Sequence, residues 1–297
     1  MKRRVIIDTD PGLDDSIAIL FALGCGKFEV LGLTTVGGNI GLQQTARNAG
    51  GLLAVMNRSD IPVICGADGP MARDGFDIVA AVHGADGLKG VPLPQPLTPP
   101  LSGAVEWMAK VLEEAEPASV DILALAPLTN VARLLTEHRH LTGRIGRIIA
   151  MGGTIKEPGN SGPRAEFNFA SDPEAVSVVL GSPVKLTVIP LDVTRKFRAH
   201  VDYVNALPDT PHGKIARQLL TAYLQDGVRS RPLHDPCVML LAVDPYLFTI
   251  ERIPIDVDLG EEPDAGTLLV DRRSAPVDIA MGIDVERALE LLRTGFI

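Results

Sequence analysis

Short runs of apolar, mostly β-branched residues alternate with amphipathic stretches over the first two-thirds of the chain. Consecutive apolar residues are typical of strands covered on both faces, and apolar residues three and four apart are typical of helices. The predicted strands are Val5–Ile7, Val30–Val36, Ile61–Ile64, Val120–Leu125, Arg147–Ala150 and Lys185–Ile189. The predicted helices are Asp14–Leu23, Gln43–Met56, Ser102–Glu116, Leu128–His138 and Ser171–Leu180. This alternation predicts an α/β fold with a doubly wound, mostly parallel sheet.

The last third of the chain carries a different pattern. Three strand-like runs, Ile250–Leu259, Gly266–Val270 and Val277–Met281, follow one another without helices between them, and a helical pattern at Val285–Arg293 comes next. Strands joined without a crossover helix pair in antiparallel fashion. We therefore expect an antiparallel C-terminal extension that makes the sheet a mixed one.

Two segments show neither the strand pattern nor the helix pattern. Gly66–Pro100 holds six glycines and six prolines, and Leu191–Pro232 is helical only around Ile215–Gln225. Long irregular segments within a compact fold often serve function. Because α/β elements resume on both sides of each segment, neither is a domain linker, and residues 1–297 are predicted to form a single Rossmann-like domain.

The composition excludes several classes of protein. Hydrophobic residues make up 46% and charged residues 22% of the chain, a balance that is typical of a packed domain and not of a disordered one. The formal net charge of −9 lacks the basic footprint that phosphate-backbone binding requires. Eight Phe, three Tyr and one Trp are too few for an obvious base-stacking platform. Nucleic acid is therefore not a predicted partner.

Cysteine usage and the first residues indicate a cytoplasmic protein without membrane association. The three cysteines, Cys25, Cys65 and Cys237, show no CxxC spacing, so neither a disulfide framework nor a zinc ribbon is predicted. A basic start is followed only by Val5–Ile7 before Asp8, which is too short for the apolar region of a signal peptide.

Four carboxylates within eight residues are the strongest chemical signal. They lie in Asp8-Thr9-Asp10-Pro11-Gly12-Leu13-Asp14-Asp15, directly after the first predicted strand, at the sheet edge where open α/β folds bind ligands. Asp14 and Asp15 could simply stabilise a helix N-terminus. However, like charges this close raise one another's pKa unless a cation lies among them, and oxygen ligands suit Ca²⁺ or Mg²⁺. A metal site is the favoured interpretation.

A second polar segment follows another predicted strand. After Met151-Gly152-Gly153, the residues Asn160, Glu166 and Asn168 supply amide and carboxylate groups that have little reactivity of their own. Such groups suit hydrogen bonds to several hydroxyls of a sugar. A polar loop that uses asparagine for turns is the alternative.

Shorter motifs admit structural explanations when each is taken alone. Gly37-Gly38-Asn39 is typical of a turn, and Leu125–Asn130 of a strand end followed by a first helical turn. A lone histidine in a Gly/Pro-rich loop, such as His83, is usually solvated. Asp235, which follows His234, could serve only as a helix cap.

Taken together, these motifs resemble the nucleoside hydrolase family of the inosine–uridine preferring type. The resemblance covers nearly the whole chain: DTDPGLDD at 8–15, GGN at 37–39, HGADGL at 83–88, LAPLTN at 125–130, MGG at 151–153, GNSGPRAEFN at 159–168 and HDP at 234–236. The first motif and the AEFN segment, in this order, are highly specific.

The resemblance implies the residues of the site. It implies a Ca²⁺ ion held by Asp10, Asp15, Asp235 and the backbone carbonyl of Leu125, a position at which related proteins often have threonine. It implies that the ribose hydroxyls are bound by Asp14, Asn39, Asn160, Glu166, Asn168 and Asp235. It places His83 and His234 on the side of the leaving base. The family further implies a homotetramer or dimer.

The implied reaction is hydrolysis of the N-glycosidic bond of a ribonucleoside, inosine or uridine, to ribose and free base. We expect a Ca²⁺-activated water, with Asp10 as its general base and His234, as an imidazolium, assisting the leaving base. Tyr223 and Gln225 are expected near the base, whose identity the sequence leaves open.

Two other functions compete with this one. A haloacid-dehalogenase-like phosphatase also begins with a strand and DxD, but such a protein has Thr or Val where this chain has Gly12. It also needs a later lysine and a paired acidic motif, which we do not find. A non-catalytic nucleoside- or Ca²⁺-binding protein on the same scaffold is the third possibility.

Overall fold

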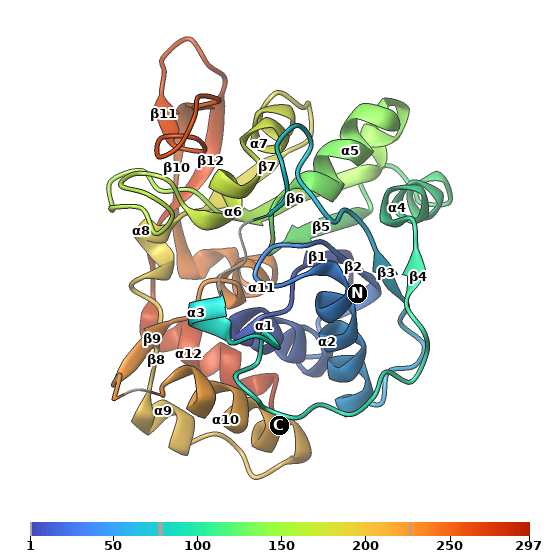
Figure 1. The fold of residues 1–297 in the computed structure, drawn as a ribbon, viewed down its shortest axis with the longest axis vertical. Coiled ribbons are helices and arrows are strands. Elements are labelled where there is room, and N and C mark those ends of the chain that lie inside the picture. Colours follow the sequence, from blue (N-terminus) through green and yellow to red (C-terminus); the bar gives the residue numbers. More distant parts are fainter. Residues whose placement is uncertain (1, 77–79, 226) are drawn as a thin grey trace.

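The computed structural model describes residues 2–76, 80–225 and 227–297, and it is built around a ten-stranded sheet (Figure 1). The strands are β1 (Arg3–Thr9), β2 (Phe28–Thr35), β3 (Val63–Cys65), β4 (Leu101–Ser102), β5 (Val120–Ala124), β6 (Ile145–Met151), β7 (Leu186–Ile189), β10 (Phe248–Val257), β11 (Leu268–Val270) and β12 (Pro276–Ile283). Their order across the sheet is β11-β10-β12-β7-β6-β5-β1-β2-β3-β4. Strands from both ends of the chain thus share one sheet.

The sheet is mostly parallel, as the alternating pattern predicts. Every neighbouring pair from β12 to β4 is parallel, including β12 with β7. Only β10 runs against its neighbours, because it pairs in antiparallel fashion with both β11 and β12. The predicted antiparallel extension is therefore confirmed, because β10 pairs in antiparallel fashion with both β11 and β12, and β12 also joins the parallel part of the sheet through β7.

Helices cover both faces of the sheet, which confirms the doubly wound arrangement (Figure 1). The main helices are α1 (Leu13–Gly24), α2 (Leu42–Val55), α4 (Ala104–Glu113), α5 (Thr129–Glu137), α7 (Pro173–Leu180), α10 (Pro211–Tyr223), α11 (Pro236–Val243) and α12 (Val285–Thr294). Val5 and Ile7 of β1 pack in one apolar cluster with α1, α2, α10, α11 and α12. Ile6 points to the other face and packs in a second cluster with α4, α5 and α7. Strands buried on both faces explain the continuous apolar runs of the sequence.

The two segments without periodicity differ in structure. In Gly66–Pro100, whose residues 77–79 lie outside the described part, the structure shows one short helix, α3 (Ala80–His83). Leu191–Pro232 is more regular than expected. It holds α8 (Leu191–Thr194), β8 (Arg198–His200), α9 (Val201–Asn205), α10 and β9 (Ser230–Pro232). The predicted helix around Ile215–Gln225 is confirmed by α10. The other elements are too short to produce a detectable period, so the sequence pattern did not predict them.

The carboxyl ends of the central strands gather the sequence motifs. Asp10 follows β1, Asn39 lies in the loop after β2, Leu125 follows β5, and Gly152 follows β6. Because these strands are parallel neighbours, their carboxyl ends lie along one edge of the sheet. The longest helix of the described residues has 14 residues, and none of the described helices is long and apolar enough to cross a membrane.

Candidate active site

Carboxylates from the two ends of the chain meet at this edge of the sheet. Asp14 and Asp15 occupy the first turn of α1, and Asp235 lies immediately before α11. Each of the three offers one carboxylate oxygen, and these atoms lie within 4.8 Å of one another. The Asp235 side chain makes no capping hydrogen bond to α11, so a purely structural role as helix cap does not explain it.

Asn39 connects this group to Asp10. Its backbone N–H donates to Asp10 Oδ2 at 2.6 Å, and its side-chain amide donates to Asp15 Oδ2 at 3.1 Å and to the Asp10 carbonyl at 3.3 Å. A Cβ at Gly38 would collide with the Asp10 carboxylate. The glycine of this motif therefore allows the β2 loop to approach the acidic group, which a simple turn would not require.

The site gathers four buried carboxyl groups, and burial is the largest cause that raises the pKa of each: Asp10, Asp14, Asp15 and Asp235. Burial and the charge of Asp15 raise the pKa of Asp10 well above its usual range, and burial raises the pKa of Asp14 to about 6. Burial, followed by the charges of Asp14, Asp15 and Asp10, raises the pKa of Asp235 well above its usual range. Asp10 Oδ1 is buried and has no hydrogen-bond partner among the described residues. A buried set of oxygens with an unpaired member fits a hard divalent cation.

The structure groups the metal-site residues somewhat differently from the resemblance. The mutually close set contains Asp14 together with Asp15 and Asp235, whereas Asp10 adjoins it through Asn39. The carbonyl of Leu125 accepts a hydrogen bond of 2.7 Å from Asn168 Nδ2. Since a carbonyl oxygen has two lone pairs, this bond still leaves one for a cation.

Glu166 and Asn168 form a rigid polar wall. The Glu166 carboxylate accepts from the backbone N–H groups of Gly153 and Asn168, each at 3.0 Å, and of Phe169 at 3.2 Å, so it caps α6 (Phe167–Ser171). Burial raises the pKa of Glu166 to about 7. Asn160 Oδ1 accepts from the Phe167 N–H at 2.9 Å. We call Asn160, Glu166 and Asn168 the polar end of the site.

The opposite side of the site is aromatic and partly cationic. The rings of His83 and Tyr223 stack with centroids 6.4 Å apart, and the Arg231 guanidinium carbon lies 5.8 Å from the centre of the Tyr223 ring. His83 is buried, and its Nδ1 accepts from the Leu13 N–H at 3.2 Å, so it is not the solvated histidine that its loop alone would indicate. We call His83, Tyr223 and Arg231 the aromatic end. Gln225 is exposed and does not line the cavity, so its expected place near the base was wrong.

A cavity of about 230 Å³ joins the two ends. Its walls include every expected ribose contact and both expected base-side histidines: Asp14, Asn39, His83, Asn160, Glu166, Asn168, His234 and Asp235. Leu125 lines it too, whereas Asp10 and Asp15 are buried and are not among its lining residues. Arg231 could not be identified from the sequence, because no sequence motif includes it.

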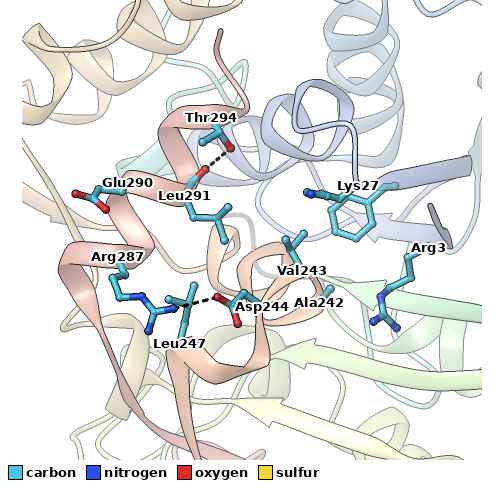
Figure 2. A pocket seen from close by; sticks show the side chains of 11 residues that line it. Arg3, Lys27, Ala242, Val243, Asp244, Leu247, Arg287, Glu290, Leu291 and Thr294 are labelled. Carbon is cyan, nitrogen blue, oxygen red and sulfur yellow. Dashed lines mark hydrogen bonds and ion pairs between the residues drawn. The ribbon is translucent and has the colours of Figure 1, made fainter. Parts of the chain in front are cut away.

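A larger cavity lies elsewhere, near the amino ends of β1 and β2 (Figure 2). It measures about 600 Å³, and Arg3 and Lys27 stand on one side of it. Across from them, Arg287 donates to Asp244 at 3.3 Å. This cavity contains none of the motif residues, and the Asp244 carboxylate in its wall is already paired with Arg287. The smaller cavity is therefore the candidate active site.

Comparisons with known proteins identify the family of this chain. The family model described as inosine-uridine preferring nucleoside hydrolase matches residues 5–290. The pyrimidine-specific ribonucleoside hydrolase RihA of Escherichia coli O7:K1 (strain IAI39 / ExPEC) is 39% identical over 281 residues, covering 91% of this chain and 89% of that protein. The plant nucleoside hydrolase PpNRh1 superposes with a TM-score of 0.92 at 30% identity, over 100% and 99% of the two chains. The purine-preferring ribonucleoside hydrolase from Gardnerella vaginalis superposes with a TM-score of 0.92 at 28% identity, over 99% and 98%.

Proposed function

Because the chain belongs to the inosine–uridine preferring nucleoside hydrolase family, whose members cleave the N-glycosidic bonds of ribonucleosides, we propose that its preferred substrates are pyrimidine ribonucleosides, uridine first. A relative that is 39% identical is named pyrimidine-specific, which favours uridine over inosine. The observation that carries the proposal is the cavity itself, which has a buried acidic group between a polar and an aromatic end. The polar end suits the hydroxyl groups of a ribose, and the aromatic end suits the ring of a base.

We propose that Asp10, Asp15, Asp235 and the Leu125 carbonyl hold Ca²⁺. The support is the crowding of buried carboxylates, together with the unpartnered Asp10 Oδ1. When bound, the ion would lower the pKa of a water and orient it. Asp14, which the structure places beside Asp15 and Asp235, would then serve both the ion and a ribose hydroxyl.

Side chains of the site would accept the proton of the attacking water and bind the ribose. Asp10 Oδ1 has no hydrogen-bond partner within the described part of the chain, so we assign it the role of accepting the proton of the attacking water. Asn160, Glu166 and Asn168, with Asp14 and Asn39 opposite, would bind the ribose hydroxyls. Because backbone hydrogen bonds already hold Glu166 and Asn168, these side chains are positioned before substrate arrives.

The aromatic end would receive the base. Tyr223 and His83 offer ring faces for stacking, and His234 lines the cavity directly before Asp235. A hydrogen bond from the His234 ring to the base would help it leave, since a free base departs poorly as an anion. This arrangement requires no covalent nucleophile.

One assay separates this function from its competitors. Release of reducing sugar from uridine and inosine, and release of phosphate from a phosphomonoester, should be measured side by side. We expect sugar from uridine, less from inosine, and no phosphate from the ester. Phosphate release would support the phosphatase, and a folded protein that binds uridine without cleaving it would support the non-catalytic alternative.

A further inference from the structure

Arg231 lies at the aromatic end beside Tyr223, and no carboxylate of the described residues pairs with it. It lies on β9, where Arg231 pairs with Ala199 of β8, and its side chain lines the cavity. Its guanidinium carbon lies 5.8 Å from the centre of the Tyr223 ring. Its Nε is buried and has no hydrogen-bond partner, and no ion pair joins it to any residue within the described ranges. A guanidinium placed in this way has donors left for a ligand.

The position of Arg231 relative to a substrate follows from the two ends of the cavity. If the ribose lies at the polar end, above the carboxylates, its base extends toward Tyr223 and Arg231. Arg231 is the only lysine or arginine among the described residues that line this cavity.

The reaction places negative charge at this end of the cavity. When the bond between C1′ and the base nitrogen breaks, the electron pair stays with the base, while the oxygen of water bonds to C1′. The proton that this water loses goes to Asp10. In uracil the charge spreads from N1 to the carbonyl oxygens O2 and O4. Carbonyl oxygens that gain charge are strong acceptors for a guanidinium.

We propose that Arg231 binds a carbonyl oxygen of the leaving base and stabilises the charge that develops on it. This inference rests on the proposed function and deepens it, because it selects substrates whose base carries a carbonyl group, uridine foremost. Arg231 then acts as a catalytic residue at the base, on the opposite side of the glycosidic bond from the carboxylates.

A structural role for Arg231 makes a different prediction. If the guanidinium only supports the Tyr223 ring, its loss should impair all substrates equally. If it stabilises developing charge, its loss should matter less for a base that carries negative charge more easily. 5-Fluorouridine is such a substrate, because fluorine makes the base more acidic while the ribose and both carbonyls remain.

The test compares Arg231→Gln, Arg231→Lys and the control Arg229→Gln on uridine and 5-fluorouridine. Arg229 is exposed, two residues earlier, and outside the cavity, so its replacement removes the same charge without touching the base. We expect Arg231→Gln to lower kcat/KM for uridine about 10- to 100-fold, the loss of one charged hydrogen bond. The loss on 5-fluorouridine should be several-fold smaller. Arg231→Lys should recover part of the activity, and Arg229→Gln should match the wild type.

The outcomes are distinct. Equal losses on both substrates, or no loss on either, would overturn the role of Arg231 in a protein that still cleaves uridine. A wild-type protein that is folded by circular dichroism and fails to cleave uridine would overturn the proposed function instead.

Discussion

The imidazole Nδ1 of His234 lies 2.7 Å from the hydroxyl oxygen of Thr194, in the buried helix α8. Burial, followed by the charges of Arg195, His83 and Arg198, lowers the pKa of His234 to about 3. The ring is therefore neutral near pH 7, which revises the expected imidazolium. If the Thr194 hydroxyl donates to Nδ1, the ring proton lies on Nε2, which is then free to donate to the base.

The first prediction assigns His234 to the leaving base. His234→Ala should lower kcat/KM for uridine by about 10²–10⁴-fold, because the base loses its hydrogen-bond donor. The same variant should largely retain hydrolysis of p-nitrophenyl riboside, whose leaving group needs no donor. Thr194→Val, which removes only the partner of Nδ1, should show a smaller loss with the same selectivity. Steady-state kinetics with both substrates provide the measurement.

The control is Asp10→Ala, which should impair both substrates because the water step serves both. Parallel losses on the two substrates in His234→Ala would show that His234 merely orders the start of α11 around Asp235.

How much of this site the sequence could predict depends on how local each signal is. Asp10, Asp14 and Asp15 are contiguous and follow a clear strand, so their place at a sheet edge is evident from pattern alone. Asp235 joins them only through the tertiary fold, and it became a candidate through the HDP motif. Arg231 has neither kind of signal, because its place in the cavity depends on the pairing of β9 with β8.

The fold shows the same division. Buried parallel strands such as β1 and β5 are visible as apolar runs, whereas the direction of a strand is not encoded in its own residues. β12 resembles the antiparallel β10 in composition, yet it pairs in parallel with β7. The path of the chain between strands sets this direction, and residue patterns do not record that path.

The second prediction concerns Glu166 and pH. Burial raises its pKa to about 7 in the folded protein from 4.5 when unfolded, so the folded state binds the proton more tightly. Its contribution to stability is therefore greatest in acid and is lost as the pH rises from about 4.5 to 7. Relative to Glu166→Gln, the wild type should lose about 2 kcal/mol of unfolding free energy between pH 5.5 and pH 8. Urea unfolding in the presence of a chelator measures this difference.

Glu174→Gln is a matched control for that measurement. Its hydrogen bonds to Arg73 lower the pKa of Glu174, so its contribution to stability is already complete above pH 5.5. The difference between this variant and the wild type should stay constant from pH 5.5 to 8. If Glu166→Gln behaves in the same way, Glu166 is not the buried acid inferred from its surroundings.

The third prediction concerns recognition of ribose. Asn168→Ala should lower kcat/KM sharply, because Asn168 lines the cavity and its Nδ2 also holds the Leu125 carbonyl in place. 2′-Deoxyuridine should be a poor substrate, since a site built around each hydroxyl leaves buried groups unpaired when one is missing. Comparable kcat/KM for uridine and deoxyuridine, with only a few-fold loss in Asn168→Ala, would mean that the polar end does not contact the sugar.

The last prediction concerns the unfolding temperature of Asp235→Asn, which should change in opposite directions without and with Ca²⁺. Without a cation, Asp235 lies buried among Asp14, Asp15 and Asp10, whose charges disfavour its ionised form. Asp235→Asn removes one of these repelling charges and keeps the shape of the side chain, so in a chelator the variant should unfold at a higher temperature than the wild type. With Ca²⁺ present the order should invert, because the wild type gains stability by binding the ion and the variant has lost a charged ligand.

Asp8→Asn is the control for this prediction. Asp8 is also a buried acid, with a pKa raised to about 6 by burial, but its carboxylate accepts hydrogen bonds from Thr34 and Asn130, outside the cluster. Its effect on the unfolding temperature should be the same with and without Ca²⁺. A wild-type protein whose unfolding temperature ignores Ca²⁺, and whose activity survives the chelator, would rule out the metal site.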